Sequence, residues 1–187
     1  MKPLHSNSLI LVWRVAEYEA RNLKASMIEP SHLLLGLCKI VDVDLPALVA
    51  KDIADRDEIL EELLREVRRL RNVFRAAGLN ARALRRRLRA KGGGNRFTLS
   101  GAGRLRRSKN AKQVFVDAEH FAAIANSPVY PTHLLYAALL TDDESRDAIM
   151  NELAIDKNRL RQVAKREALP HHNAEFLQPD KDRTNWN

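Results

Sequence analysis

Apolar residues recur at steps of three and four along most of the chain, a period typical of helices that bury one face. Residues 55–77 carry the longest such stripe, from Ile59 to Phe74, and Gly78 follows it, as glycines often follow a last helical turn. Residues 30–40 are nearly all apolar, which predicts a short helix buried at the centre of the fold. Further helices are predicted at 6–23, 81–90, 108–125, 131–140 and, as a pair, within 145–168. The pattern therefore predicts an all-α fold.

The same helical pattern occurs twice. The sequence Pro-Ser-His-Leu-Leu at 30–34 returns as Pro-Thr-His-Leu-Leu at 131–135, which is 101 positions later. Matching segments flank this motif in both halves: Ser6 and Ser108, AEYEA (16–20) and AEHFA (118–122), FRAAGLNARALRRRL (74–88) and MNELAIDKNRLRQVA (150–164). Each half has roughly 60 residues of this common pattern, close to the lower limit for a stable lone core. We therefore expect two four-helix repeats packed face to face as one pseudo-twofold domain.

The spacings within the two halves place an insertion in the first. The separation between His32 and Leu79 is more than twice the separation between their counterparts, His133 and Ile155. The first repeat therefore carries an additional segment, at about 42–66, which lengthens its amphipathic helix. The predicted organisation is repeat 1 at 5–90, a Gly/Arg-rich linker at 91–107, repeat 2 at 108–168 and a flexible tail at 169–187.

Short segments in both halves carry a resemblance to a known family. They are AEYEA (16–20), IEPSHLLLGL (28–37) and GLNARAL (78–84) in the first half, and SKNAKQV (108–114), THLL (132–135) and LAIDKNRL (153–160) in the second. In this order they resemble the Clp N-terminal domain, the double Clp repeat of the ClpA, ClpB and ClpC unfoldases. The resemblance covers about residues 5–168, apart from the insertion and the linker. It implies two pseudo-symmetric four-helix Clp repeats packed as one domain.

The resemblance also implies a function. Clp N-terminal domains are not enzymes; they bind substrate or adaptor proteins and pass them to attached AAA+ rings. This sequence has no G-x-x-x-x-G-K-(S/T) loop, so we expect a stand-alone chain that acts as a chaperone or proteolysis adaptor for an ATP-dependent Clp unfoldase. In some ClpC-type relatives a Glu before the repeated His helps to recognise phosphoarginine. Ser31 and Thr132 stand at those positions here, so the resemblance does not imply phosphoarginine binding.

The starts of the two repeated helices are the candidate ligand site. We expect a groove with apolar walls and a polar rim, between the repeats or beside their first helices. Four residues flank these helix starts and are the candidate protein-binding residues: Met27, Ser31, Tyr130 and Thr132.

The repeated histidines raise the question of catalysis. The proline two positions before His32 and His133 suits the first helical position, so each imidazole falls in the first turn, where it can bind a free backbone N–H. Cys38 has no counterpart in the second half, where Leu139 stands, so a Cys-His pair is not indicated. The six histidines show no metal-ligand spacing. We therefore predict a non-enzyme without catalytic residues, metal or cofactor, in which Cys38 is an inert core thiol.

The positive charge of the chain is concentrated in its middle. The net charge is +8, yet 17 of the 32 Lys and Arg lie within 65–112 beside a single acid, and the other residues carry 15 basic and 23 acidic side chains. Such a segment indicates an acidic partner, either a protein or nucleic acid. Few aromatic residues lie nearby for base stacking, so a nucleic-acid-associated accessory protein using 82–112 is the alternative function. The residues of this basic patch are Arg82, Arg85, Arg86, Arg87, Arg89, Arg106 and Arg107.

Three features of the sequence bear on the location of the protein. A single cysteine permits no internal disulfide, which fits a reducing compartment. No apolar run approaches the roughly 20 residues that span a bilayer, and the first residues lack the apolar core of a signal peptide. We therefore expect a soluble, cytoplasmic protein with no membrane partner.

Overall fold

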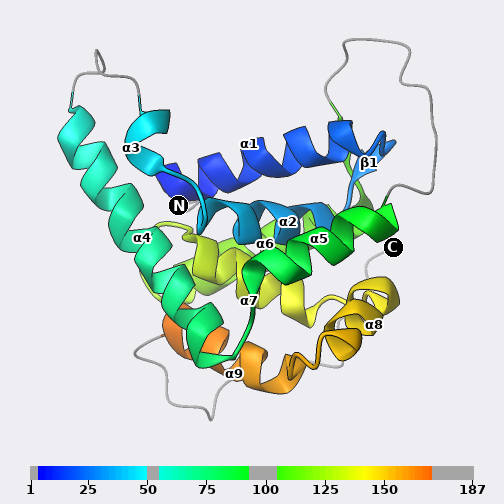
Figure 1. Ribbon diagram of the computed structural model, residues 1–187. Helices are drawn as coiled ribbons and strands as arrows, with labels where there is room; N and C mark the ends of the chain where they lie inside the picture. The colour runs from blue at the N-terminus through cyan, green and yellow to red at the C-terminus, as the bar shows by residue number, and fades with distance from the viewer. Residues whose placement is uncertain (1–3, 50–54, 93–104, 170–187) are drawn as a thin grey trace, which may run out of the picture.

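The structure is a computed structural model that describes residues 4–49, 55–92 and 105–169 (Figure 1). Two short parallel strands, β1 (Met27–Ile28) and β2 (Arg106–Arg107), are the only strands in these ranges. The helices, in chain order, are α1 (Asn7–Asn22), α2 (Pro30–Ile40), α3 (Leu45–Leu48), α4 (Arg56–Ala76), α5 (Ala81–Gly92), α6 (Lys109–Ile124), α7 (Pro131–Leu140), α8 (Glu144–Glu152) and α9 (Lys157–Ala168). The predicted all-α fold is therefore confirmed.

The two repeats exchange backbone contacts in a reciprocal way. In one contact β1, just before α2, pairs with β2, and the backbone N–H of Ser108 donates to the carbonyl of Ile28 (3.0 Å). In the other contact the backbone N–H of Ser6 donates to the carbonyl of Val129, just before α7 (3.2 Å). The segment before the second helix of each repeat thus lies beside the start of the first helix of the other repeat. This is the pseudo-twofold arrangement that the repeated sequence predicts.

Local backbone features are also repeated. The side-chain oxygen of Ser6 accepts a hydrogen bond from the N–H of Leu9 (3.3 Å), and that of Ser108 accepts one from Ala111 (3.1 Å), so both serines cap their helices. The turn before the fourth helix of each repeat contains a residue with positive φ. It is Gly78 in the first repeat (φ 70°) and Ala154 in the second (φ 53°). The sequence match between 74–88 and 150–164 therefore reflects the same chain path.

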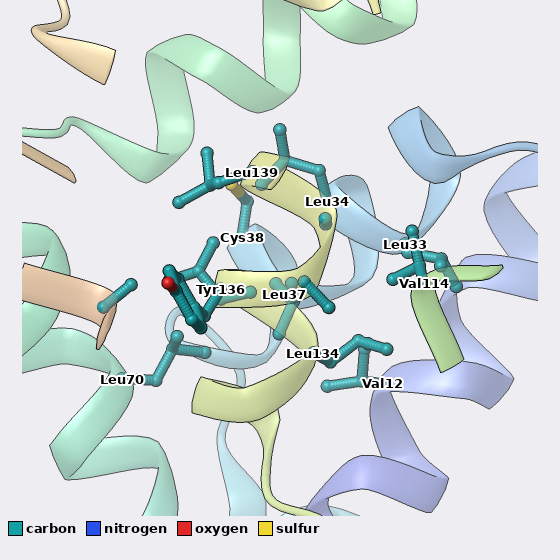
Figure 2. Packing of buried hydrophobic residues seen from close by; sticks show 14 of the residues in the cluster. Val12, Leu33, Leu34, Leu37, Cys38, Leu70, Val114, Leu134, Tyr136 and Leu139 are labelled. Carbon is teal, nitrogen blue, oxygen red and sulfur yellow. The ribbon is translucent and has the colours of Figure 1, made fainter. Parts of the chain in front are cut away.

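The two all-apolar helices α2 and α7 lie at the centre of the core. Figure 2 shows Leu33, Leu34, Leu37 and Cys38 of α2 among side chains of α7 and of neighbouring helices. Every residue of α2 except Ser31 and Lys39 is buried, and in α7 every residue except Leu140 is buried. The prediction that residues 30–40 form a central buried helix is confirmed. Because helices from both repeats cover this pair, neither repeat encloses a core by itself.

The additional residues of the first repeat form α3 and extend α4. Helix α4 has 21 residues, whereas its counterpart α8 has 9. The added turns pack beside the start of α1, where both Ser6 and Ser8 donate hydrogen bonds to Oε2 of the buried Glu66. Asn7 donates to Glu62, one turn earlier on α4 (2.8 Å). The inserted part of α4 is therefore joined to the start of α1 by polar contacts as well as by apolar packing.

Two ends of the predicted linker need correction. Helix α5 continues to Gly92 instead of ending at residue 90, and near that end Leu88 is buried and Arg89 forms an ion pair with Glu19. At the other end, Arg106–Arg107 are strand β2 and pair with β1. Leu169, which we assigned to the tail, is buried, and the remainder of the tail lies outside the described residues.

Gly36 lets helices α1 and α2 approach closely. A Cβ atom at this position would lie 2.6 Å from the backbone carbonyl oxygen of Val12, and a backbone atom cannot rotate away. We expect Gly36→Ala to lower the free energy of unfolding by about 2 kcal/mol, because the two helices would have to separate. Urea unfolding followed by circular dichroism measures this change.

Gly78→Ala is the matched control. Gly78 also has unfavourable geometry for alanine, with a φ of 70°, but no atom lies within 4 Å of the added methyl group. The cost should be about 1 kcal/mol, since the strain is confined to one residue. A Gly36→Ala variant no less stable than Gly78→Ala would contradict the close approach of α1 and α2.

Candidate functional site

Two of the predicted ligand-binding residues, Met27 and Ser31, line the same cavity. The cavity has a volume of about 460 Å³ and lies where β1 leads into α2, against the last turns of α5. Met27 is 43% exposed, although it is a large apolar residue. The complete lining is Leu23, Ala25, Ser26, Met27, Glu29, Ser31, His32, Leu35, Leu88 and Lys91. We call this space the α2–α5 cavity.

The α2–α5 cavity combines an apolar wall with polar groups. Leu23 in the turn after α1, Leu35 on α2 and Leu88 on α5 supply aliphatic surface. Glu29 and Lys91 supply one negative and one positive charge, so the cavity has no strong preference for a charged ligand. Its volume lies in the range of about 300–1,000 Å³ that is typical of ligand pockets. This arrangement suits a segment of peptide that has both apolar side chains and backbone polar groups.

Each repeated histidine caps the start of its own helix. Nδ1 of His32 accepts a hydrogen bond from the backbone N–H of Glu29 (2.9 Å), and Nδ1 of His133 accepts one from Tyr130 (2.9 Å). Burial lowers the pKa of both imidazoles, and that of His133 falls to about 4. Both rings are therefore neutral at pH 7. The prediction that the imidazoles bind free backbone N–H groups is confirmed.

Beyond this shared contact, the two helix starts differ. Nε2 of His133 donates a hydrogen bond to the backbone carbonyl of Ala168 at the end of α9 (2.9 Å). Thr132 is only 4% exposed, and Tyr130 is half-buried with its ring stacked on that of His133. Neither Tyr130 nor Thr132 lines the α2–α5 cavity. The structure thus brings together the two candidates of repeat 1 and places those of repeat 2 elsewhere.

Sequence reasoning missed most of the wall of this cavity. Leu88 and Lys91 lie on α5, far along the chain from Met27, and nothing in their local pattern distinguishes them from other helical residues. Leu23 and Ala25 lie at the end of α1 and in the loop that follows it. Besides the candidates Met27 and Ser31, only the lining residues of the repeated stretch 28–37, which are Glu29, His32 and Leu35, carried a signal in the sequence.

The seven arginines of the predicted basic patch do not form one surface. Arg82, Arg85, Arg86 and Arg89 follow one face of α5 and, with Lys39, line a cavity of about 380 Å³. Arg87 instead forms an ion pair with Glu152 of α8 (2.6 Å). Arg106 and Arg107 belong to β2, and the guanidinium of Arg107 lies over the rings of Trp13 and Phe115.

Acidic side chains offset part of the charge along α5. Arg85 lies 3.4 Å and Arg82 3.8 Å from a carboxylate oxygen of Asp42, which also lines the same cavity. Arg89 forms hydrogen bonds and an ion pair with the buried carboxylate of Glu19. Burial by itself would raise the pKa of Glu19, but the contacts with Arg89 and Lys39 outweigh it, so the pKa is lowered.

The single cysteine of the chain, Cys38, is free and buried. Burial raises the pKa of the Cys38 thiol to about 12, so it is protonated at pH 7 and a poor nucleophile. Within residues 4–49, 55–92 and 105–169, no three His, Cys, Asp or Glu side chains are placed to hold a metal ion. In the same ranges, no helix is both long and apolar enough to cross a membrane.

Comparisons with known proteins bear on the fold. No protein-family model and no curated protein sequence matches the chain. Among solved structures, the Hsp104 N-terminal domain from Candida albicans is similar, with a TM-score of 0.61 and 17% identity over 87% of this chain and 89% of that one. The N-terminal domain of the chaperone ClpD from Arabidopsis thaliana has a TM-score of 0.50 and 18% identity over 86% and 91%. The chain has the Clp N-terminal domain fold.

A further solved structure agrees with this assignment. It comes from a study of a malarial protein secretion system and has a TM-score of 0.60, with 19% identity over 88% of this chain and 94% of that chain. The Clp N-terminal fold expected from the repeated motif is therefore confirmed. Because all three sequence identities are low, the likeness concerns the fold, and the ligand of this chain has to be argued from its own residues.

The buried histidine of the second repeat predicts a pH dependence of stability. Its pKa is about 4 in the folded chain and about 6.5 when solvated, so the unfolded chain binds more protons between these values. The stabilisation is complete above about pH 6.5 and is lost as the pH falls toward 4. We expect this contribution of His133 to fall by on the order of 3 kcal/mol across that window. Urea unfolding at a series of pH values measures it.

The comparison should be made against His133→Asn, which does not titrate. Glu66 titrates in the same window with the opposite sign, because burial raises its pKa to about 7. Its stabilising contribution is present below about pH 4.5 and is lost as the pH rises through 7. Subtracting the variant from the wild type at each pH removes the Glu66 contribution. A difference that does not change with pH would show that the pKa of His133 is not lowered.

Proposed function

We propose that this protein is a non-catalytic protein-binding module that takes peptide segments of substrate or adaptor proteins into the α2–α5 cavity. The observation that carries the proposal is the cavity itself. It holds Met27 and Ser31, two candidate residues at the repeated helix start, beside an apolar wall. Cavities of this kind bury apolar side chains, while the surrounding polar groups fix orientation.

The chemistry of the lining favours a range of peptide sequences over one small molecule. Met27 is exposed, unbranched and polarizable, and such side chains adapt to partners of different shape. Leu35 and Leu88 offer aliphatic surface without a directional requirement. Glu29 and Lys91 also line the cavity and carry polar groups that can contact a peptide backbone. The combination suits a receptor that accepts many unfolded or exposed segments.

The Clp N-terminal fold supports a link to an ATP-dependent unfoldase. The solved structures that share it include N-terminal domains of Hsp104 and of the chaperone ClpD. The present sequence contains no Walker-type loop, so ATP hydrolysis would come from a ring outside it. In this role the module binds a protein through the α2–α5 cavity and presents it to a Clp ring, in the reducing environment that its single cysteine suits.

The alternative function in nucleic-acid binding receives less support. Arg87 and Arg89 form ion pairs with acidic side chains of the chain itself, and Arg82 and Arg85 lie near Asp42. The one aromatic side chain of α4, Phe74, is buried and cannot stack on a base. The α5 face therefore supports at most general attraction of anions.

A pair of glutamate substitutions tests the proposed function. The ligand probe is a carboxymethylated, permanently unfolded protein, and binding is measured by fluorescence anisotropy. We expect Met27→Glu to weaken binding about tenfold, because it places a charge at the apolar cavity. Leu64→Glu on α4 is the control, since Leu64 is 42% exposed and does not line the cavity. This control should bind like the wild type.

Two results would argue against the proposed function. One is the absence of any binding to unfolded protein. The other is equal binding by the Met27→Glu and Leu64→Glu variants, which would place the binding surface away from the cavity. Steeply salt-dependent binding to random duplex DNA, without affinity for unfolded protein, would favour the alternative.

A further inference from the structure

The hydrogen bonding of Nε2 differs between His32 in repeat 1 and His133 in repeat 2. In repeat 2, Nε2 of His133 donates to the carbonyl of Ala168. Ala168 is 1% exposed and the following Leu169 is 4% exposed, so the end of α9 is packed into the protein beside this imidazole. The second repeat therefore carries its own occupant at this position: a helix-end carbonyl followed by a leucine.

Within residues 4–49, 55–92 and 105–169, no helix-end carbonyl or leucine occupies the equivalent position of repeat 1 in this way. The helices α5 and α9 have equal length, and they begin and end at matching positions of the two repeats. At the positions of Ala168 and Leu169, the first repeat has Gly92 and Gly93, so its sequence offers no leucine there. At the position of the bulky, buried Tyr136, the first repeat has Leu35, which lines the α2–α5 cavity.

His32 consequently has an unused donor. It is 6% exposed and lines the α2–α5 cavity. Its Nδ1 accepts from the N–H of Glu29, and a neutral imidazole that accepts at one nitrogen carries its hydrogen on the other, so Nε2 bears the N–H. Among the residues that the structure describes, no acceptor is hydrogen-bonded to this Nε2. Because this Nε2 is not among the fully enclosed unpaired side-chain atoms of the described residues, it is open to solvent at the cavity, and a ligand there can supply the acceptor in place of water.

We propose that His32 recognises a backbone carbonyl of a bound peptide through its Nε2–H, and that the next residue of this peptide places a leucine-sized apolar side chain on the wall formed by Leu35 and Leu88. The peptide thus reproduces in repeat 1 what Ala168 and Leu169 do in repeat 2. This inference rests on the proposed function, because it specifies what the α2–α5 cavity binds. It makes His32 the residue that orients the peptide backbone.

The difference between the two repeats favours a peptide as the ligand of the α2–α5 cavity. The Nε2–H of His32 is a neutral donor. The corresponding Nε2–H of His133 donates to a peptide carbonyl. The charges near His32, those of Glu29 and Lys91, are of opposite sign and do not favour a polyanion. The wall is aliphatic, as required for a leucine-sized side chain and unlike a surface that stacks bases. A partner peptide with one apolar residue after an accessible carbonyl meets all three conditions.

The sequence of the protein itself supplies a defined probe. An acetylated and amidated peptide with the sequence of residues 165–170, KREALP, contains the carbonyl and the leucine that close repeat 2. The control peptide carries Leu169→Asp. Each is titrated into the full chain labelled with ¹⁵N, and backbone and imidazole signals are followed by NMR. We expect the first peptide to shift Met27, Ser31 and Lys91 and to move the Nε2–H signal of His32, and the control peptide to leave them unchanged.

Two variants separate the parts of the proposal. His32→Asn keeps an acceptor near the position of Nδ1 and removes the Nε2–H, so peptide affinity should fall about tenfold while the fold is retained. His120→Asn is the matched control, because His120 is an exposed histidine on α6, and it should bind as the wild type does. Leu35→Tyr introduces the residue that repeat 2 has at this position, Tyr136, and should abolish peptide binding. If this variant does not fold, the His32→Asn variant and the control peptide still test the proposal.

The outcomes distinguish this inference from the proposed function. Binding of unfolded protein that depends on Met27, together with peptide binding that is unchanged in His32→Asn, overturns the inference alone. Peptide-induced shifts that map away from the cavity also overturn it.

A variant with Phe97→Ser and Leu99→Ser tests whether the chain itself occupies the cavity. If it shifts the cavity signals without added peptide, the chain itself occupies the cavity, and a partner peptide is not the ligand.

Discussion

The contact between the two buried helices α2 and α7 is the interaction on which the fold depends. Both are apolar on nearly every face, so each has to be covered on all sides, and the helices of both repeats are needed to do it. The close approach of α1 at Gly36 completes one side of this cover. Because a four-helix repeat of roughly 60 residues is close to the lower limit for a stable lone core, burial between the repeats also adds to the stability of each.

The same helix start serves two purposes in the two repeats. In both, a proline opens the helix and the histidine two residues later accepts a backbone N–H, which satisfies a polar group that the buried helix end would otherwise leave unpaired. The capping contact uses only one nitrogen of the ring. The second nitrogen is free to differ between the repeats: it closes repeat 2 onto α9, and in repeat 1 it lies at a cavity. The histidine that caps the helix through one nitrogen can therefore bind a ligand through the other.

The structure changes the interpretation of the positive charge in the basic segment. In the sequence it is a run of positive charge against a single acid, which favours an external anionic partner. In the structure the acids that meet it come from distant parts of the chain. Glu19 of α1 pairs with Arg89, Asp42 lies near Arg85, and Glu152 of α8 pairs with Arg87. These three arginines of α5 therefore join the helix to the rest of the fold.

The sequence by itself determined the helices, the repeat and the central position of residues 30–40, because periodicity, helix-capping residues and repeated spacing are local signals. It also marked Met27 and Ser31 as candidate binding residues and His32 as a residue that caps its own helix start. Only the tertiary structure decided that the first helix start opens onto a cavity and the second is closed. That difference depends on where the ends of α5 and α9 lie, and contacts between segments far apart in the chain leave no pattern in the local sequence.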